Sequence, residues 1–304
     1  MSVIKSNILL LLAAAIWGFA FVAQRVGMEH VGPFTFNGVR FLLGSLSLIP
    51  LMYFHSNPQT SRMGFKSAML PGLLAGTVLF CGASLQQAGL IYTTAGKAAF
   101  VTCLYIVLVP VIGIFLGQSV GRWTWLGCIL ALVGLYFLCI KESASIQLGD
   151  LLELIGAIFW ALHILIIGYF SRRVDVLKLS FFQFLTCAVL SLVTAAITET
   201  MVIDNILAAA VPILYGGLCS VGIAYTLQVV GQKNAPPAHA AIILSMETVF
   251  AVIGGFLLLD ERIGGQEIVG CALMLTGMLV SQLQSLRFNH VTPPSSTRSI
   301  DTSP

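Results

Sequence analysis

The sequence predicts an all-α, polytopic membrane protein with ten transmembrane helices, arranged as two inverted five-helix repeats. Three observations lead to this fold class: an apolar composition, ten separate apolar runs, and one passage that occurs twice. The chain of 304 residues is 58% hydrophobic and only 9% charged, whereas a soluble domain carries about 25% charged residues. Its mean hydropathy of +0.96 excludes an ordinary soluble core, so the fold has to satisfy its backbone hydrogen bonds inside a bilayer.

Ten apolar runs are long enough to cross a membrane, which takes about 20 residues of helix. The runs cover residues 7–25, 34–54, 68–90, 95–117, 123–140, 150–170, 178–198, 209–231, 238–259 and 265–286. Gly, Pro, Asn and charged residues separate them, as turns require. None of these interruptions is long enough to hold a soluble domain.

A passage in the first half of the chain recurs in the second half. Residues 95–138 match residues 237–280, and Lys97 aligns with His239 at an offset of 142 residues. Three further pairs align at an offset of 143 residues: Gly127 with Gly270, Cys128 with Cys271, and Gly134 with Gly277. The repeat predicts two related halves that are joined by a short loop.

The two expected units are a first five-helix repeat at 7–140 and a second at 149–286. Because five crossings is an odd number, the second repeat starts from the opposite side of the membrane. Inverted repeats of this kind are typical of transporters whose substrate site lies near the midplane. Residues 287–304 are polar and rich in Pro, Ser and Thr, which predicts a disordered cytoplasmic tail.

Basic residues in the short loops favour an orientation with both termini in the cytoplasm. With the N-terminus inside, the inner segments hold ten Lys and Arg residues and the outer segments hold four, and cytoplasmic loops carry the excess of positive charge. The short loops and the lack of sorting signals suit a bacterial cell. We therefore expect a multi-pass protein of the cell inner membrane, that is, the plasma membrane.

Small residues mark where helices approach one another closely. Gly72 and Gly76 are four residues apart, as are Gly113 and Gly117, and such pairs predict contacts between membrane helices. All seven Cys residues lie in or at the ends of apolar runs. This placement favours buried free thiols over a disulfide framework.

Two ionisable residues lie deep in predicted helices. Arg40 is roughly 9–10 Å into its helix; it either snorkels to the outer interface or braces a neighbouring helix, or it presents a positive charge to a cavity. Glu247 is roughly 14 Å past Ala238, close to the middle of the bilayer. An intramembrane carboxylate is a functional candidate: it could carry a proton, bind a substrate amine, or pair with Arg40 or His163. The counterpart of Glu247 in the first repeat is Tyr105.

Aromatic and amide side chains recur within the predicted helices. Some must face the bundle interior, because lipid offers no hydrogen-bond partners. Our candidate substrate-binding residues are Trp17, Arg40, Tyr105, Trp160, Tyr225 and Glu247. For His163, a structural hydrogen bond is the first interpretation. Lys97 and His239 begin matching helices, where snorkelling explains both and a gate on each side is the alternative.

The sequence gives no support for an enzymatic active site. The stretch 117–121 fits the hydrolase nucleophile pattern, but it lies in a short turn between membrane helices, without the strand and the His and Asp partners that the chemistry needs. The sequence has no zinc-protease motif and no phosphate-binding loop. We therefore expect no catalytic residue, no metal and no cofactor, and a net charge of +3 gives no nucleic-acid footprint.

The ten runs and their local sequences resemble the drug/metabolite transporter superfamily, in its EamA-type branch. Four stretches carry the resemblance: Ala14-Ala15-Ile16-Trp17-Gly18, Arg40-Phe41-Leu42-Leu43-Gly44, Leu104 to Pro110, and Glu247-Thr248-Val249-Phe250-Ala251. Residues 257–262, with Gly270, Cys271 and Gly277, add to it. The chain departs from the family pattern at three positions: Thr248 stands where the family usually has Pro, Asp260 replaces a Gly, and Gln118 replaces a Glu.

The resemblance implies a compact ten-helix basket that moves a small solute by alternating access, with helices one, three, four, six, eight and nine lining the cavity. We expect a secondary transporter that exports or exchanges small metabolites, with amino acids or related compounds as the first substrate class. The alternatives are sugars, nucleotide derivatives or cationic drugs as substrates, an intramembrane enzyme acting on lipid, and a non-transporting scaffold or sensor. The expected partners are a small-molecule substrate and the lipid bilayer, not nucleic acid, and homodimer formation is open.

Overall fold

The computed structural model describes residues 2–54, 65–92, 95–139, 148–258 and 264–289, and all regular structure within these ranges is helical. The first half contains α1 (Val3–Gly27), α2 (Pro33–Phe54), α4 (Phe65–Tyr92), α5 (Ala95–Thr102), α6 (Tyr105–Phe115) and α7 (Arg122–Cys139). The second half contains α8 (Leu148–Phe170), α9 (Val176–Thr198), α10 (Ile203–Ala208), α11 (Ala210–Leu214), the π-helix η1 (Tyr215–Tyr225), α12 (Thr226–Gln232), α13 (Pro237–Leu244), α14 (Glu247–Leu258) and α15 (Gly265–Asn289).

The prediction of an all-α, polytopic membrane protein is confirmed. Within the described ranges, seven helical stretches are long and apolar enough to cross a membrane, and three shorter apolar helices cover Tyr105–Phe115, Arg122–Phe137 and Gly265–Ser281. The described part of every predicted run is therefore mostly helical, although a count of ten crossings stays a prediction. α15 continues to Asn289, three residues into the segment predicted as a tail, and the rest of that segment lies outside the described residues.

The sequence did not reveal the interruptions inside three of the runs. The fourth run is broken between α5 and α6, and the ninth between α13 and α14. The eighth run combines α11, the π-helix η1 and α12, and the short helix α10 precedes it. Wide π-turns inside α-helices occur often at functional sites, and all three interruptions lie in segments that line the central cavity.

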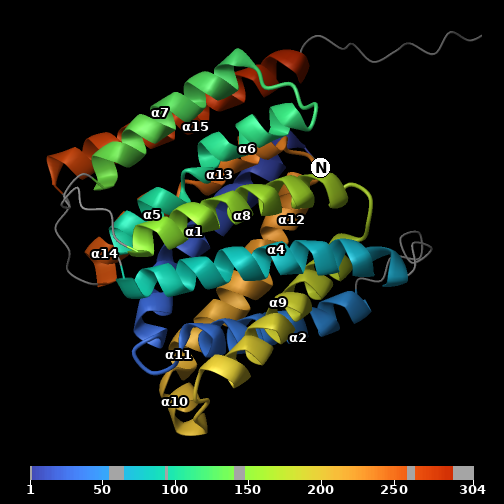
Figure 1. Cartoon of the computed structure of the whole chain (residues 1–304). Coiled ribbons are helices and arrows are strands. Elements are labelled where there is room, and N and C mark those ends of the chain that lie inside the picture. Colours follow the sequence, from blue (N-terminus) through green and yellow to red (C-terminus); the bar gives the residue numbers. More distant parts are fainter. Residues whose placement is uncertain (1, 55–64, 93–94, 140–147, 259–263, 290–304) are drawn as a thin grey trace, which may run out of the picture.

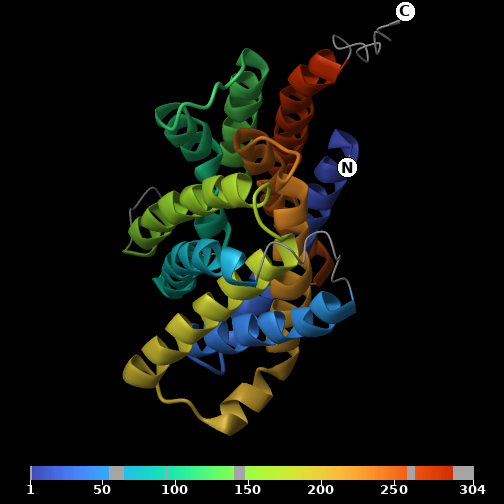
Figure 2. The ribbon, with the colours of Figure 1, turned by 90° about the vertical axis from the view of Figure 1, so that its right-hand side faces the viewer.

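The helix pairs form layers that follow one another along the molecule. In both views the pair α7 and α15 lies at one end, the pair α2 and α9 lies with α10 at the other end, and α4 and α8 lie between them (Figures 1 and 2). These pairs make the most extensive helix–helix contacts of the described structure. A cluster of buried apolar side chains from α1, α6, α8, α13 and α14, with one residue each from α7 and α15, joins the α7–α15 pair to α8. A second cluster joins α2, α4 and α9 to η1.

Glycines bring α7 and α15 into backbone contact. A Cβ atom at Gly127 would lie 2.7 Å from the carbonyl oxygen of Gly277, and one at Gly134 would lie 2.6 Å from the carbonyl oxygen of Gly270. Early residues of one helix thus meet late residues of the other, so the two helices run antiparallel. Because Gly127 aligns with Gly270 and Gly134 with Gly277 in the repeat, each glycine packs against the counterpart of the other, which is the pattern that a two-fold axis produces.

The predicted glycine contacts are confirmed in one helix and wrong in another. In α4, Gly72 lies against Phe182, and a Cβ atom at Gly76 would lie 2.6 Å from the carbonyl oxygen of Gln183, so both glycines pack on α9. Gly117, by contrast, has a φ of +77°, and a Cβ atom added there would have no neighbour within 4 Å. It serves the turn after α6, because only glycine adopts this left-handed conformation without strain.

Glu199 joins the end of α9 to the start of α2. Its carboxylate accepts hydrogen bonds from the backbone N–H groups of Phe34 and Thr35, both at 2.8 Å, and from the Thr35 hydroxyl at 2.6 Å. The first N–H groups of a helix have no partner within the helix. Glu199, which follows α9, supplies those partners for α2 and so fixes the ends of the two helices together.

Candidate functional site

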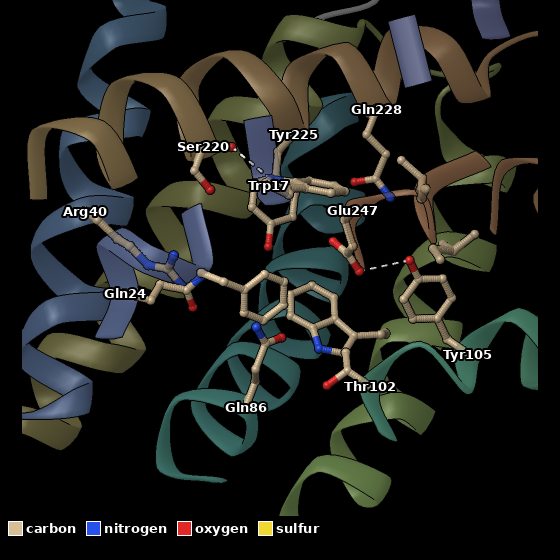
Figure 3. Close-up of a pocket in the computed structure, with 14 residues that line it drawn as sticks. Trp17, Gln24, Arg40, Gln86, Thr102, Tyr105, Ser220, Tyr225, Gln228 and Glu247 are labelled. Carbon is tan, nitrogen blue, oxygen red and sulfur yellow. Dashed lines mark hydrogen bonds between the residues drawn. The ribbon is translucent and has the colours of Figure 1, made fainter. Parts of the chain in front are cut away.

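A narrow cavity lies among the helices, and all six predicted site residues line it (Figure 3). Its volume is about 40 Å³, which is room for a few water molecules and not for a metabolite. The lining residues are Trp17, Phe21, Gln24, Arg40, Gln86, Thr102, Tyr105, Trp160, Ile164, Ser220, Tyr225, Gln228, Leu244 and Glu247. The helices expected from the resemblance all contribute, and α2 adds Arg40.

Glu247 and its repeat counterpart Tyr105 bind each other directly. The Tyr105 hydroxyl donates to Glu247 Oε1 at 3.0 Å, and the Cys103 thiol lies 3.5 Å from the same oxygen. The two partners are 142 residues apart, the offset of the repeat at this point. Neither Arg40 nor His163 pairs with Glu247 among the described contacts, so the pairing that we considered from the sequence is wrong.

Both partners of this hydrogen bond stand at the first residue of a half-helix. Tyr105 opens α6 and Glu247 opens α14, and the chain between α13 and α14 turns through short-range bonds such as Met246 N–H to the Ile243 carbonyl at 3.1 Å. The Thr248 hydroxyl donates to the Ser245 carbonyl at 2.8 Å. The interruption therefore forms without the Pro that the family usually has at Thr248. The N-terminus of α14 places partial positive charge beside the Glu247 carboxylate.

Arg40 occupies the opposite side of the cavity from Glu247 (Figure 3). Its side chain is 4% exposed. Nε donates to Asn37 Oδ1 at 3.0 Å, and the guanidinium carbon lies 5.4 Å from the Phe36 ring centre and 5.0 Å from the Phe41 ring centre. Among the described side chains, no carboxylate pairs with Arg40. The structure thus excludes snorkelling to the surface and leaves a buried cation at the cavity wall.

Three aromatic side chains form the wall between these two charges. The ring centres of Trp17 and Tyr225 are 4.6 Å apart, and Trp160 stacks on Tyr225 at 6.4 Å with 19° between the planes. Trp17 Nε1 donates to the Ser220 carbonyl at 3.2 Å, which fixes the indole against η1. Amide groups of Gln24, Gln86 and Gln228 complete the lining.

Two other sequence candidates, His163 and His239, are not among the residues that line the cavity. His163 is fully buried and its Nε2 lies 2.9 Å from Gln183 Oε1, so the interpretation as a structural hydrogen-bonding residue holds. His239 is 5% exposed within α13, which does not fit a snorkelling side chain. The side chain of Lys97 lies outside the described residues.

Sequence reasoning missed one buried acid and several lining residues. Glu153 lies in α8 with 0% exposure and accepts a hydrogen bond from the Thr102 hydroxyl at 2.6 Å. It follows Asp150 by one turn at the start of a predicted run, and it was not considered as a candidate from the sequence. An acidic residue one turn inside an apolar run was the available signal. Gln24, Phe21 and Ser220 gave no signal of this kind.

The arrangement can bind a small molecule with two opposite charges. A buried guanidinium on one side can receive a carboxylate in two hydrogen bonds, and a carboxylate on the other can accept hydrogen bonds from an ammonium group or take up a proton. Aromatic faces and amides between them can contact an apolar or polar body. The cavity has to widen before such a solute fits.

Comparison with known proteins gives one consistent result. Residues 4–140 and 147–282 each match the EamA-like transporter family. An uncharacterized transporter of Archaeoglobus fulgidus is 31% identical over 90% of this chain and 85% of its own length. A protein of Escherichia coli named "Probable amino-acid metabolite efflux pump" is 24% identical over 91% of this chain and 94% of its own length.

A solved crystal structure shares the fold. It superposes with a TM-score of 0.78 at 19% sequence identity, over 93% of this chain and 98% of the other. The family and the names of the relatives indicate a transporter rather than an enzyme. The chain is a multi-pass membrane protein and belongs to the EamA-like transporter family.

Proposed function

We propose that this transporter exports small zwitterionic metabolites, amino acids or close relatives, across the inner membrane by alternating access. The observation that carries the proposal is the placement of Arg40, which pairs with no described carboxylate, and of Glu247 on opposite sides of one aromatic cavity. The substrate carboxylate binds Arg40 and the substrate amine binds Glu247. The relatives of Escherichia coli and Salmonella typhimurium that are named amino-acid metabolite efflux pumps support this substrate class and this direction.

Glu247 also provides a reason for exchange. The carboxylate binds an ammonium group or a proton, and the two compete for the same oxygens. A carrier that releases the solute outside and returns with a proton at Glu247 therefore couples export to proton uptake. The hydrogen bond between Tyr105 and Glu247 supports a role in the conformational cycle, because it joins the two half-helices α6 and α14 at the centre of the molecule.

The test is counterflow in proteoliposomes with matched analogues of one amino acid. The panel contains the amino acid, its decarboxylated amine and its deaminated acid, together with a sugar, a nucleotide derivative and a cationic drug. We expect saturable exchange of the zwitterion and much weaker competition from either single-charge analogue. Preferred exchange of the sugar, nucleotide or drug would overturn the substrate class.

Two variants assign each charge to its partner. Arg40→Gln should lose the discrimination between the amino acid and its amine, while Glu247→Gln should lose the discrimination between the amino acid and its deaminated acid. This design isolates each contact, because a variant and its matching analogue remove the same interaction from opposite sides. Arg25→Gln, a substitution at an exposed residue in the last turn of α1, is the control and should retain both preferences.

A further inference from the structure

Glu153 is a second carboxylate within the bundle, and the exchange described above makes no use of it. Its side chain is 0% exposed, and Oε2 accepts from Thr102 Oγ1 at 2.6 Å. Oε1 is buried with no hydrogen-bond partner among the described residues. A Cβ atom at Gly89 would lie 2.6 Å from this oxygen, so the glycine of α4 provides the space that the carboxylate fills.

The surroundings of Glu153 favour a neutral acid. Burying an ionised carboxylate without a partner costs far more free energy than giving it a proton, and no described cationic side chain pairs with Glu153. On its own helix, Asp150 lies one turn earlier and is close enough to repel a negative charge. The elements packed against α8 carry these titratable groups: Lys66, Cys81 and Tyr92 on α4, Tyr105 on α6 and His239 on α13. The Lys97 side chain on α5 is outside the described residues.

Thr102 connects Glu153 with the cavity. It lines the cavity and at the same time donates to Glu153. It is also the last residue of α5, and Tyr105, which binds Glu247, is the first residue of α6. The two buried carboxylates are therefore held by the two sides of one helix interruption, so a change at this interruption alters the contacts of both.

We propose that Glu153 is a second proton-binding site of the carrier, loaded from the cavity through the hydroxyl of Thr102. Thr102 Oγ1 passes its hydrogen to Glu153 Oε2 as it receives one from a protonated water of the cavity; one O–H bond forms on Glu153, and the hydroxyl is restored. The return of the proton reverses both transfers. The inference rests on the proposed exchange for its role in transport, whereas the proton site itself does not depend on the substrate.

The transport test separates coupling from solute exchange. In proteoliposomes, Glu153→Gln and Thr102→Val should lose the increase in accumulation that an imposed pH gradient produces, while counterflow at equal pH changes much less. Thr102→Ser should retain the gradient response. Thr226→Val is the matched control, because Thr226 is a buried threonine of α12 that does not line the cavity. A full gradient response in Glu153→Gln, or a response to sodium in place of protons, would overturn the proposal.

A spectroscopic test needs no substrate. Infrared difference spectra of the full protein in lipid, recorded across a pH step in H₂O and D₂O, show protonated carboxyl groups. We expect one such band to vanish in Glu153→Gln, to shift in Thr102→Val, and to persist in Thr226→Val. No loss of a band in Glu153→Gln refutes the proton site even if solute is transported. If the band behaves as expected but the protein transports no amino acid, the proposed function is refuted and the proton site is not.

Discussion

The α7–α15 contact and the α6–α14 contact both join the two halves of the chain, but their chemistry differs. At the first, repeat-equivalent glycines face one another and backbone meets backbone. At the second, equivalent positions hold a tyrosine in one half and a glutamate in the other, joined by a hydrogen bond. The same residue type on both sides suits a packing surface, whereas different residue types place a single charge at the centre. The comparison separates residues that hold the halves together from residues that we propose bind the solute.

The largest effect should come from filling the glycine contact. In Gly277→Leu, the new side chain would start 2.6 Å from the Gly127 carbonyl oxygen and 2.9 Å from the Ala131 backbone nitrogen. Overpacking costs about 1–3 kcal/mol where side chains can yield, and backbone atoms yield less, so we expect little folded protein. Size-exclusion chromatography after heating measures the folded fraction. Gly265→Leu in the same helix has no neighbour within 4 Å and should behave as the wild type; equal stability of both variants would contradict a tight contact.

At the central contact, Glu247→Gln should leave stability nearly unchanged and weaken amino-acid binding by about 100-fold. The loss of a hydrogen bond to a charged group costs about 1.5–3 kcal/mol, and about 1.4 kcal/mol is a factor of ten in affinity. Competition in the counterflow assay measures the affinity. Glu29→Gln removes an exposed carboxylate just after α1 and serves as control. Wild-type affinity in Glu247→Gln would remove this residue from the site.

Arg40→Lys should weaken binding by about 10- to 30-fold, where a factor of ten corresponds to about 1.4 kcal/mol. Lysine retains the charge but not the planar pair of donors that matches a carboxylate, and the Nε hydrogen bond to Asn37 is lost with the guanidinium. The same competition assay applies, with Arg25→Lys as control. Because the lost interaction is specific to the carboxylate, the affinity for a decarboxylated amine should stay the same; a parallel loss for the amine would indicate a general effect on folding.

Tyr105→Phe should give the smallest effect, about two- to tenfold on exchange rate. It removes the hydroxyl that donates to Glu247 at 3.0 Å but retains the ring, and a single hydrogen bond contributes about 0.5–1.5 kcal/mol. Tyr169→Phe alters an exposed ring and should have no effect. If Tyr105→Phe reduced exchange as strongly as Glu247→Gln, the two partners would share one role, and the central contact would not place its function in a single charged residue.

Much of the fold could be predicted from the sequence, because the bilayer imposes strong local requirements. A run of about 20 apolar residues has few stable conformations other than a helix, so the described part of each of the ten predicted runs is mostly helical. The repeat offset aligned Tyr105 with Glu247 before their contact was visible. The interruptions at residues 103–104 and 245–246 stayed hidden, because neither stretch contains a Gly or Pro that would mark a break and short-range hydrogen bonds decide the turn.

The candidate site was predicted through single residues, not through their contacts. Trp17, Tyr105 and Glu247 were chosen because polar groups within membrane helices lack hydrogen-bond partners in lipid, and they line the cavity together with Arg40, Trp160 and Tyr225. Their role in substrate binding stays a prediction. Glu153 was missed because depth along a helix does not show which face is buried, and that depends on the helices packed around it.

The sequence alone determined the class of protein, the apolar runs and the presence of a repeat, because these follow from composition and spacing along one chain. Only the tertiary structure decided that Arg40 has no carboxylate partner among the described side chains, that Tyr105 binds Glu247, and that Thr102 connects Glu153 with the cavity. Charged groups that are far apart in the chain interact strongly only when packing fixes the distance between them and removes the water that would otherwise solvate each one.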